Sequence, residues 1–130
     1  YAWALFRRAE AVRPGAYATL DAKALQLTGG PASPQAPKGR GTYAWLMDEG
    51  QADVFLTYCT NAVAAQREVP RLRVVRLPGN LQVGAAYGLG VRRGASPAVI
   101  RFAQSLLELS AQDTLRALGF GTIEAGPVRQ

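Results

Sequence analysis

The stretch that decides the expected fold is Gly50-Gln-Ala-Asp-Val-Phe-Leu-Thr-Tyr-Cys-Thr-Asn61. Gly50 suits the position just after a helix, because glycine tolerates the positive φ of a C′ residue. Residues 54–56 are apolar and favour β structure, as in strands that are covered on both faces. The polar residues 58–61 would then lie at the carboxyl end of that strand and begin another helix. Open α/β sheets bind their ligands at this edge, so the stretch predicts a binding site.

Helical and extended patterns alternate along the rest of the chain. Helices are expected at residues 2–12, 42–49 and 60–67, from Ser96-Pro97 onward and from Ser110 onward. Strands are expected at residues 24–28, 53–58, 72–77 and 85–91. This alternation predicts an α/β fold, a three-layer sandwich with a mostly parallel sheet. Residues 29–41 hold three prolines and four glycines, which indicates a long loop that serves either for binding or as simple slack.

The composition excludes several classes of chemistry. The 130 residues suffice for one domain, 48% of them are apolar, and no run of about 18 apolar residues suggests a membrane span. The chain has no histidine, which removes Ser-His-Asp and Cys-His catalysis and His-ligated metals. Cys59 has no second cysteine to pair with and is interpreted as a buried, small apolar residue. We therefore expect no enzyme, no cofactor and no metal.

The net charge of +6, carried mostly by arginine, suits an anionic partner. The arginines nevertheless form separate short clusters without interleaved aromatic residues, as on ordinary solvated faces. Nucleic acid is therefore not expected as a partner. The sequence begins at Tyr1 and shows no signal peptide, so we expect any leader to lie outside it.

Four motifs follow one another along the chain: Gly50-Gln-Ala-Asp53 with Tyr58, Val74-Val-Arg-Leu-Pro78, Tyr87-Gly-Leu-Gly-Val91 and Leu115-Arg-Ala-Leu-Gly-Phe120. In order and spacing they resemble the C-terminal half of periplasmic molybdate-binding proteins, the solute receptors of ABC importers with the type 2 periplasmic-binding fold. The resemblance implies that residues 1–87 are part of a second lobe. It also implies that residues 88–120 return toward a first lobe and that residues 121–130 form a tail.

The resemblance also implies a function and a site. The function is non-enzymatic binding of a small oxyanion, of the molybdate, tungstate or sulfate class, between two lobes in the periplasm, with an ABC-importer permease as partner. Tyr58 matches the tyrosine whose hydroxyl contacts the anion, and Arg40 matches a position whose backbone N–H contacts it. Because the family usually has a small or apolar residue there, the Arg40 guanidinium either adds a charged donor or points to water. Gly41, Thr42 and Thr60 complete the expected ligand-binding set.

An alternative from another class remains open at this point. The same fold serves as the effector-sensing domain of transcription regulators, where a DNA-binding domain precedes it. The upstream sequence would separate the two: an apolar leader favours a receptor, and a helix-turn-helix favours a regulator.

Overall fold

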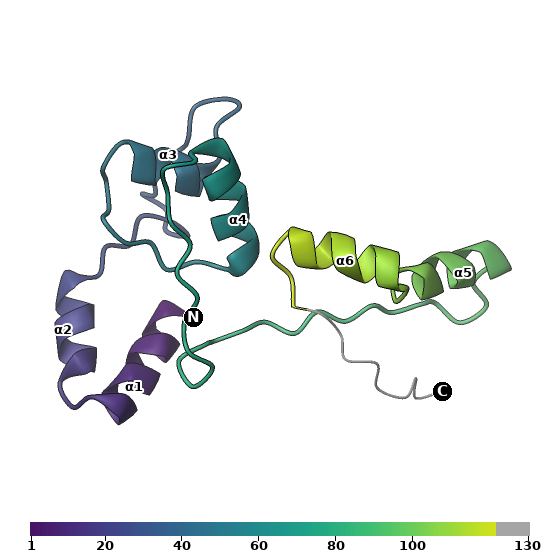
Figure 1. The fold of residues 1–130 in the computed structure, drawn as a ribbon, viewed down its shortest axis with the longest axis horizontal. Helices are drawn as coiled ribbons and strands as arrows, with labels where there is room; N and C mark the ends of the chain where they lie inside the picture. The colour runs from purple at the N-terminus through teal and green to yellow at the C-terminus, as the bar shows by residue number, and fades with distance from the viewer. Residues whose placement is uncertain (122–130) are drawn as a thin grey trace. The chain divides into compact units, whose positions relative to one another are not determined.

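The computed structural model describes residues 1–121. Residues 1–85 form one compact unit, and the described residues from 86 onward belong to a second. The helices of the described residues are α1 (Ala2–Val12), α2 (Ala16–Lys23), α3 (Thr42–Asp48), α4 (Cys59–Glu68), α5 (Pro97–Ser105) and α6 (Leu109–Ala117) (Figure 1). None of the helices in this range is long and apolar enough to cross a membrane. Residues 122–130 of the predicted tail lie outside the described residues.

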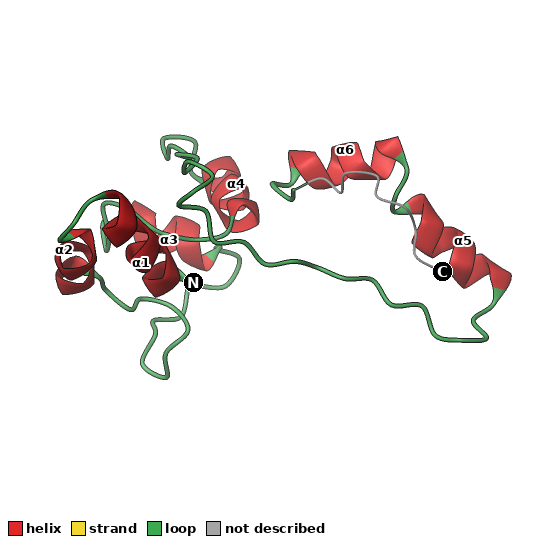
Figure 2. Ribbon diagram, turned by 90° about the horizontal axis from the view of Figure 1, so that it is seen from below, coloured by secondary structure: helices red, strands yellow, loops and turns green. Residues whose placement is uncertain are grey.

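The predicted α/β sandwich is wrong, because residues 1–121 are helices and loops with no strand among them (Figure 2). The segments predicted as strands, 24–28, 53–58, 72–77 and 85–91, lie outside the helices. A helix satisfies its backbone groups within itself, whereas a strand needs a neighbouring strand to accept and donate its hydrogen bonds. Without that neighbour, side chains expected in a sheet core face solvent: Val54 is 78% exposed and Val75 is 81% exposed.

Helices α1 and α2 pack against each other in the first unit (Figure 1). The helix predicted at residues 2–12 is confirmed by α1, and its apolar face buries Phe6, whose ring meets Tyr17 edge-on at a centroid distance of 6.4 Å. The Trp3 indole donates a hydrogen bond to Asp21 at 2.6 Å across the pair. Helix α2 was not among the helices expected from the sequence.

Helices α3 and α4 form the second packed pair of this unit. Their shared core consists of Ala44, Ala65 and Val69, and Leu46 of α3 is completely buried. Both helices were predicted to within two residues. Gly50 follows α3 with φ 68°, as predicted for a helix-ending glycine.

The second unit contains α5 and α6. The predicted start of α5 is confirmed, since Ser96 is the N-cap, Pro97 is the first helical residue and the Ser96 hydroxyl accepts the Val99 N–H. The last helix was predicted from Ser110 onward, with Ser110 and Asp113 as a capping box; the helix is present as α6, but the capping box is wrong, because α6 begins at Leu109 with Glu108 as its N-cap. Exposed apolar side chains remain along this unit, among them Phe102, which is 65% exposed.

Candidate functional site

The first turn of α4 places Tyr58 and Thr60 together. Tyr58 is the N-cap residue, in an extended conformation with φ −68° and ψ 149°, and its ring meets that of Tyr1 edge-on at a centroid distance of 5.3 Å. Neither a side-chain cap at Tyr58 nor an acidic residue occupies this first turn in the described structure. The leading N–H groups of a helix have no intrahelical acceptor, so this end of α4 has the polarity that attracts an anion.

Neighbouring side chains shape the same turn. The Asn61 amide donates a hydrogen bond to the Thr57 hydroxyl at 3.0 Å, which ties the turn to the residue before the cap. Thr60 is half-buried in this turn. Cys59 is exposed, so the interpretation as a buried apolar residue is wrong.

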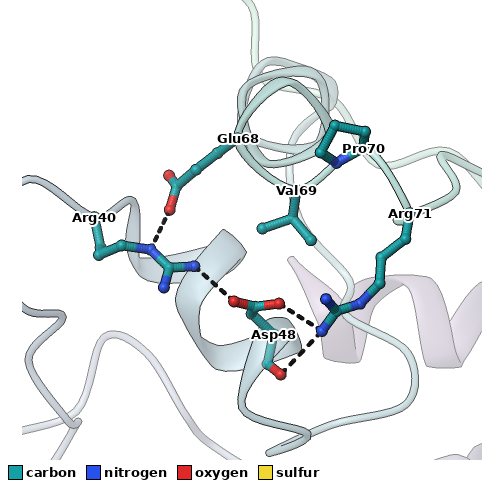
Figure 3. Close-up of a pocket in the computed structure, with 6 residues that line it drawn as sticks. All are labelled: Arg40, Asp48, Glu68, Val69, Pro70 and Arg71. Carbon is teal, nitrogen blue, oxygen red and sulfur yellow. Dashed lines mark hydrogen bonds and ion pairs between the residues drawn. The ribbon is translucent and has the colours of Figure 1, made fainter.

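At the other end of α4, Arg40 holds two carboxylates (Figure 3). Its Nε lies 2.6 Å from Oε1 of Glu68, and its Nη2 lies 3.0 Å from Oδ2 of Asp48. The backbone N–H of Gly41 donates to the second oxygen of Glu68 at 2.9 Å. Arg71 completes the group, with its Nη2 2.5 Å from Oδ1 of Asp48 and 3.2 Å from the Asp48 carbonyl oxygen.

These contacts favour the charged form of each residue: they lower the pKa values of Glu68 and Asp48 and raise that of Arg40. The hydrogen bond from Arg40 and then that from the Gly41 N–H lower the pKa of Glu68. The hydrogen bond from Arg40 is the main cause that lowers the pKa of Asp48, desolvation opposes it, and the charge of Arg71 adds a smaller lowering effect. The two carboxylates in turn raise the pKa of Arg40. Arg40, Asp48 and Glu68 are therefore charged at neutral pH.

The cluster borders an open pocket of about 430 Å³, lined also by Val69 and Pro70 (Figure 3). Sequence reasoning missed Asp48, Glu68 and Arg71 as members of this cluster. Glu68 lies 28 residues from Arg40, and Arg40 stands in the loop of residues 29–41, which has no periodic pattern that would indicate its partners. The sequence offers only a general signal. A loop arginine next to glycine is expected to pair with an acidic side chain at a helix end, but the sequence does not indicate which one.

The structure thus brings the predicted site residues together in two groups. Tyr58 and Thr60 lie at the first turn of α4. Arg40 and Gly41 contact Glu68, the last residue of α4, and Thr42 begins α3 directly after them. Because α4 spans ten residues, its two ends are roughly 15 Å apart along the axis.

What these groups can do chemically is donate hydrogen bonds, and Arg40 adds a guanidinium whose charge is balanced by Glu68 and Asp48. No group of three or more His, Cys, Asp or Glu side chains suited to a metal ion lies within residues 1–121. Amide, phenol and guanidinium donors are the groups with which proteins bind small anions.

Comparison with known proteins gives the family. The family model for "Bacterial extracellular solute-binding protein" matches residues 1–121, and the chain belongs to this family. An uncharacterized protein of Pasteurella multocida (strain Pm70) is 34% identical over 121 residues, which cover 92% of this chain and 48% of the relative. The chain therefore spans about half the length of that curated relative. No solved structure matches the chain.

The family is defined by a role rather than by one particular solute, since its members are described as bacterial extracellular solute-binding proteins.

Proposed function

We propose that this chain serves in the periplasmic solute-binding component of an ABC importer and that its solute is a small oxyanion of the molybdate, tungstate or sulfate class. The family match supports the solute-binding role. The sequence motifs that resemble molybdate-binding proteins support the anion class. The importer's membrane permease would be the protein partner.

The observation that carries the proposal is the first turn of α4. An anion placed there would meet the leading amides of residues 59–61, which have no acceptor within the helix, the positive end of the helix dipole and the Tyr58 and Thr60 hydroxyls. The absence of acidic side chains from this turn leaves nothing to repel the anion locally. Tyr58 is half-buried, and partial desolvation strengthens a hydrogen bond to a charged ligand.

The second part of the proposed ligand set is the turn at Arg40, Gly41 and Thr42. Here the Arg40 guanidinium is already paired with Glu68 and Asp48, whose charges offset its own, so a solute anion would reach it only by displacing a carboxylate. One small anion would contact both groups only after the turn has moved relative to the first turn of α4, since the two lie toward opposite ends of the helix.

The test is titration calorimetry of the full-length protein with molybdate, tungstate and sulfate. Tyr58→Phe should weaken binding by about tenfold or more, because a charge-assisted hydrogen bond contributes roughly 1.5–3 kcal/mol and about 1.4 kcal/mol is tenfold in Kd. Tyr43→Phe is the matched control, because the Tyr43 ring packs on Phe55 rather than at the α4 turn.

Two outcomes would contradict the proposal. An unchanged Kd for Tyr58→Phe would remove the α4 turn from the site. Failure of all three anions to bind, beside clear binding of an uncharged or cationic solute, would remove the oxyanion class.

A further inference from the structure

The carboxylate of Glu68 is bound through both of its oxygens by the loop that precedes α3. Oε1 pairs with Arg40 Nε at 2.6 Å, and Oε2 accepts the Gly41 N–H at 2.9 Å. The contact joins loop residues to the end of α4 across 27 and 28 positions of sequence. A guanidinium and an amide that converge on one carboxylate make a two-point receptor for an oxyanion.

Gly41 makes this contact possible by its lack of a side chain. A Cβ built at residue 41 would lie 2.9 Å from Oε2 of Glu68, which is closer than such atoms approach. The backbone itself does not require glycine, because φ −74° and ψ 132° are accessible to any residue. The glycine at position 41 is therefore explained by the close approach of the Glu68 carboxylate.

Asp48 keeps the Arg40 side chain in place from the other side. It accepts from Arg40 Nη2, the atom that Glu68 does not contact, and is itself held by Arg71. Release of Glu68 would thus leave the Arg40 guanidinium anchored by Asp48, with its Nε and the neighbouring amide open to solvent. Both partners are reachable, since the Arg40 and Glu68 side chains are 33% and 30% exposed.

We propose that Glu68 is a tethered anion that latches the loop of residues 29–41 to α4, and that a free oxyanion competes with it for Arg40 Nε and the Gly41 N–H. The latch stands on the contacts alone, while the competition rests on the proposed function. In this arrangement the resting protein holds an internal carboxylate where the solute would otherwise bind. An oxyanion that binds at Arg40 and Gly41 would therefore displace Glu68 and release the loop of residues 29–41 at the same time.

The latch is tested by limited trypsin digestion of the full chain. Lys38 and Arg40 are cleavage points within the loop, and Lys38 is exposed. Glu68→Gln keeps the shape of the side chain but removes its charge, and it should speed cleavage at Lys38 several-fold. Gly41→Ala, which displaces the same carboxylate sterically, should act in the same direction. Glu49→Gln, at an exposed glutamate next to Asp48, and Gly79→Ala are the matched controls and should leave the rate unchanged.

The competition is tested by titrating sulfate and molybdate at constant ionic strength. Glu68→Gln should bind these anions at least tenfold tighter than the unchanged chain, and Glu49→Gln, with the same change in net charge, should not. Unchanged cleavage in both Glu68→Gln and Gly41→Ala would overturn the latch. Faster cleavage without tighter anion binding would overturn the competition.

The two proposals fail separately. Tighter binding by Glu68→Gln together with no effect of Tyr58→Phe would keep the competition and refute the α4 turn as the solute site. Weaker binding by Tyr58→Phe with no effect of Glu68→Gln would keep the α4 turn as the solute site and refute the competition.

Discussion

The Glu10 carboxylate accepts the backbone N–H of Tyr17 at 2.8 Å, and so the last turn of α1 caps the first turn of α2. Its other oxygen accepts the N–H of Gly15 at 2.9 Å. Gly15 is the N-cap of α2, has φ 83° and offers no side chain to cap the helix. A carboxylate from the preceding helix supplies the missing acceptor and places negative charge at the helix N-terminus, where it is favourable.

Glu10→Ala should therefore lower the melting temperature by a few degrees, since it leaves two amides at the start of α2 without their acceptor. The loss should be local as well, with faster amide hydrogen exchange at Tyr17. Glu49→Ala, at an exposed glutamate, is the control and should have little effect. Equal melting temperatures for the two variants would argue against the cap.

Acid should destabilise the first unit through three carboxylates. The pKa values of Glu10, Asp48 and Glu68 all lie below their ordinary values because each accepts hydrogen bonds in the folded state. A lowered folded-state pKa means that the stabilisation is fully present above the unfolded-state pKa of about 4 and is lost as the pH falls through the lower folded-state value.

Melting temperature measured from pH 7 to pH 2.5 should therefore stay level down to about pH 5 and then fall. Glu68→Gln should show a shallower decline, because one linked proton has been removed. A decline as steep as that of the unchanged chain would show that Glu68 does not contribute to the acid transition.

Leu46→Ala should be among the most destabilising core substitutions. Leu46 is 0% exposed and is the largest completely buried side chain among residues 1–121. Removal of a buried leucine side chain costs roughly 2–5 kcal/mol of unfolding free energy. Leu25→Ala makes the same chemical change at a side chain that is 66% exposed and should stay within about 0.5 kcal/mol. Urea unfolding followed by tryptophan fluorescence compares them, and similar midpoints would contradict the described core.

Gly50→Ala isolates a backbone effect. Gly50 has φ 68°, and nothing lies within 4 Å of a Cβ built there, so the substitution adds strain without a clash. An alanine in this left-handed conformation should cost roughly 1–2 kcal/mol. Gly79→Ala has equal space and no positive φ, so it should be neutral or slightly stabilising. Equal unfolding free energies for the two variants would contradict the helix-ending conformation at Gly50.

The helices were predictable to the extent that their signals are local. The apolar face and the following Pro14-Gly15 break set both ends of α1, and Ser96-Pro97 set the start of α5. Helix α2 lacked such a signal, because its cap is Glu10, seven residues before Tyr17 and part of another helix.

The strands were predicted from apolar runs such as residues 54–56, and these runs failed as evidence for a sheet. Alternation and β-branched side chains indicate that a segment suits a pleated, buried surface. They do not indicate whether a neighbouring strand is present, and a strand forms only where such a neighbour accepts and donates its backbone hydrogen bonds. In the described residues Val54 faces solvent instead.

The candidate site was predictable only where its signals are local in the sequence. A polar turn after an apolar run located the start of α4 approximately, although the structure has Tyr58 as the N-cap and not the expected Thr60 or Asn61. Arg40 could be singled out from its loop, but its partners could not, since Glu68 and Asp48 reach it only through the tertiary fold. The ligand-binding roles of these residues stay predictions.

The exposure of Cys59 has a practical consequence. It is the single thiol of the chain, it is exposed, and it directly follows Tyr58 at the first turn of α4. A maleimide fluorophore would therefore attach at one defined position without any engineered cysteine, next to the turn where the solute is proposed to bind. The natural sequence already contains the attachment point for a reagentless optical sensor, whose emission would report whether an anion arrives at that end of the helix.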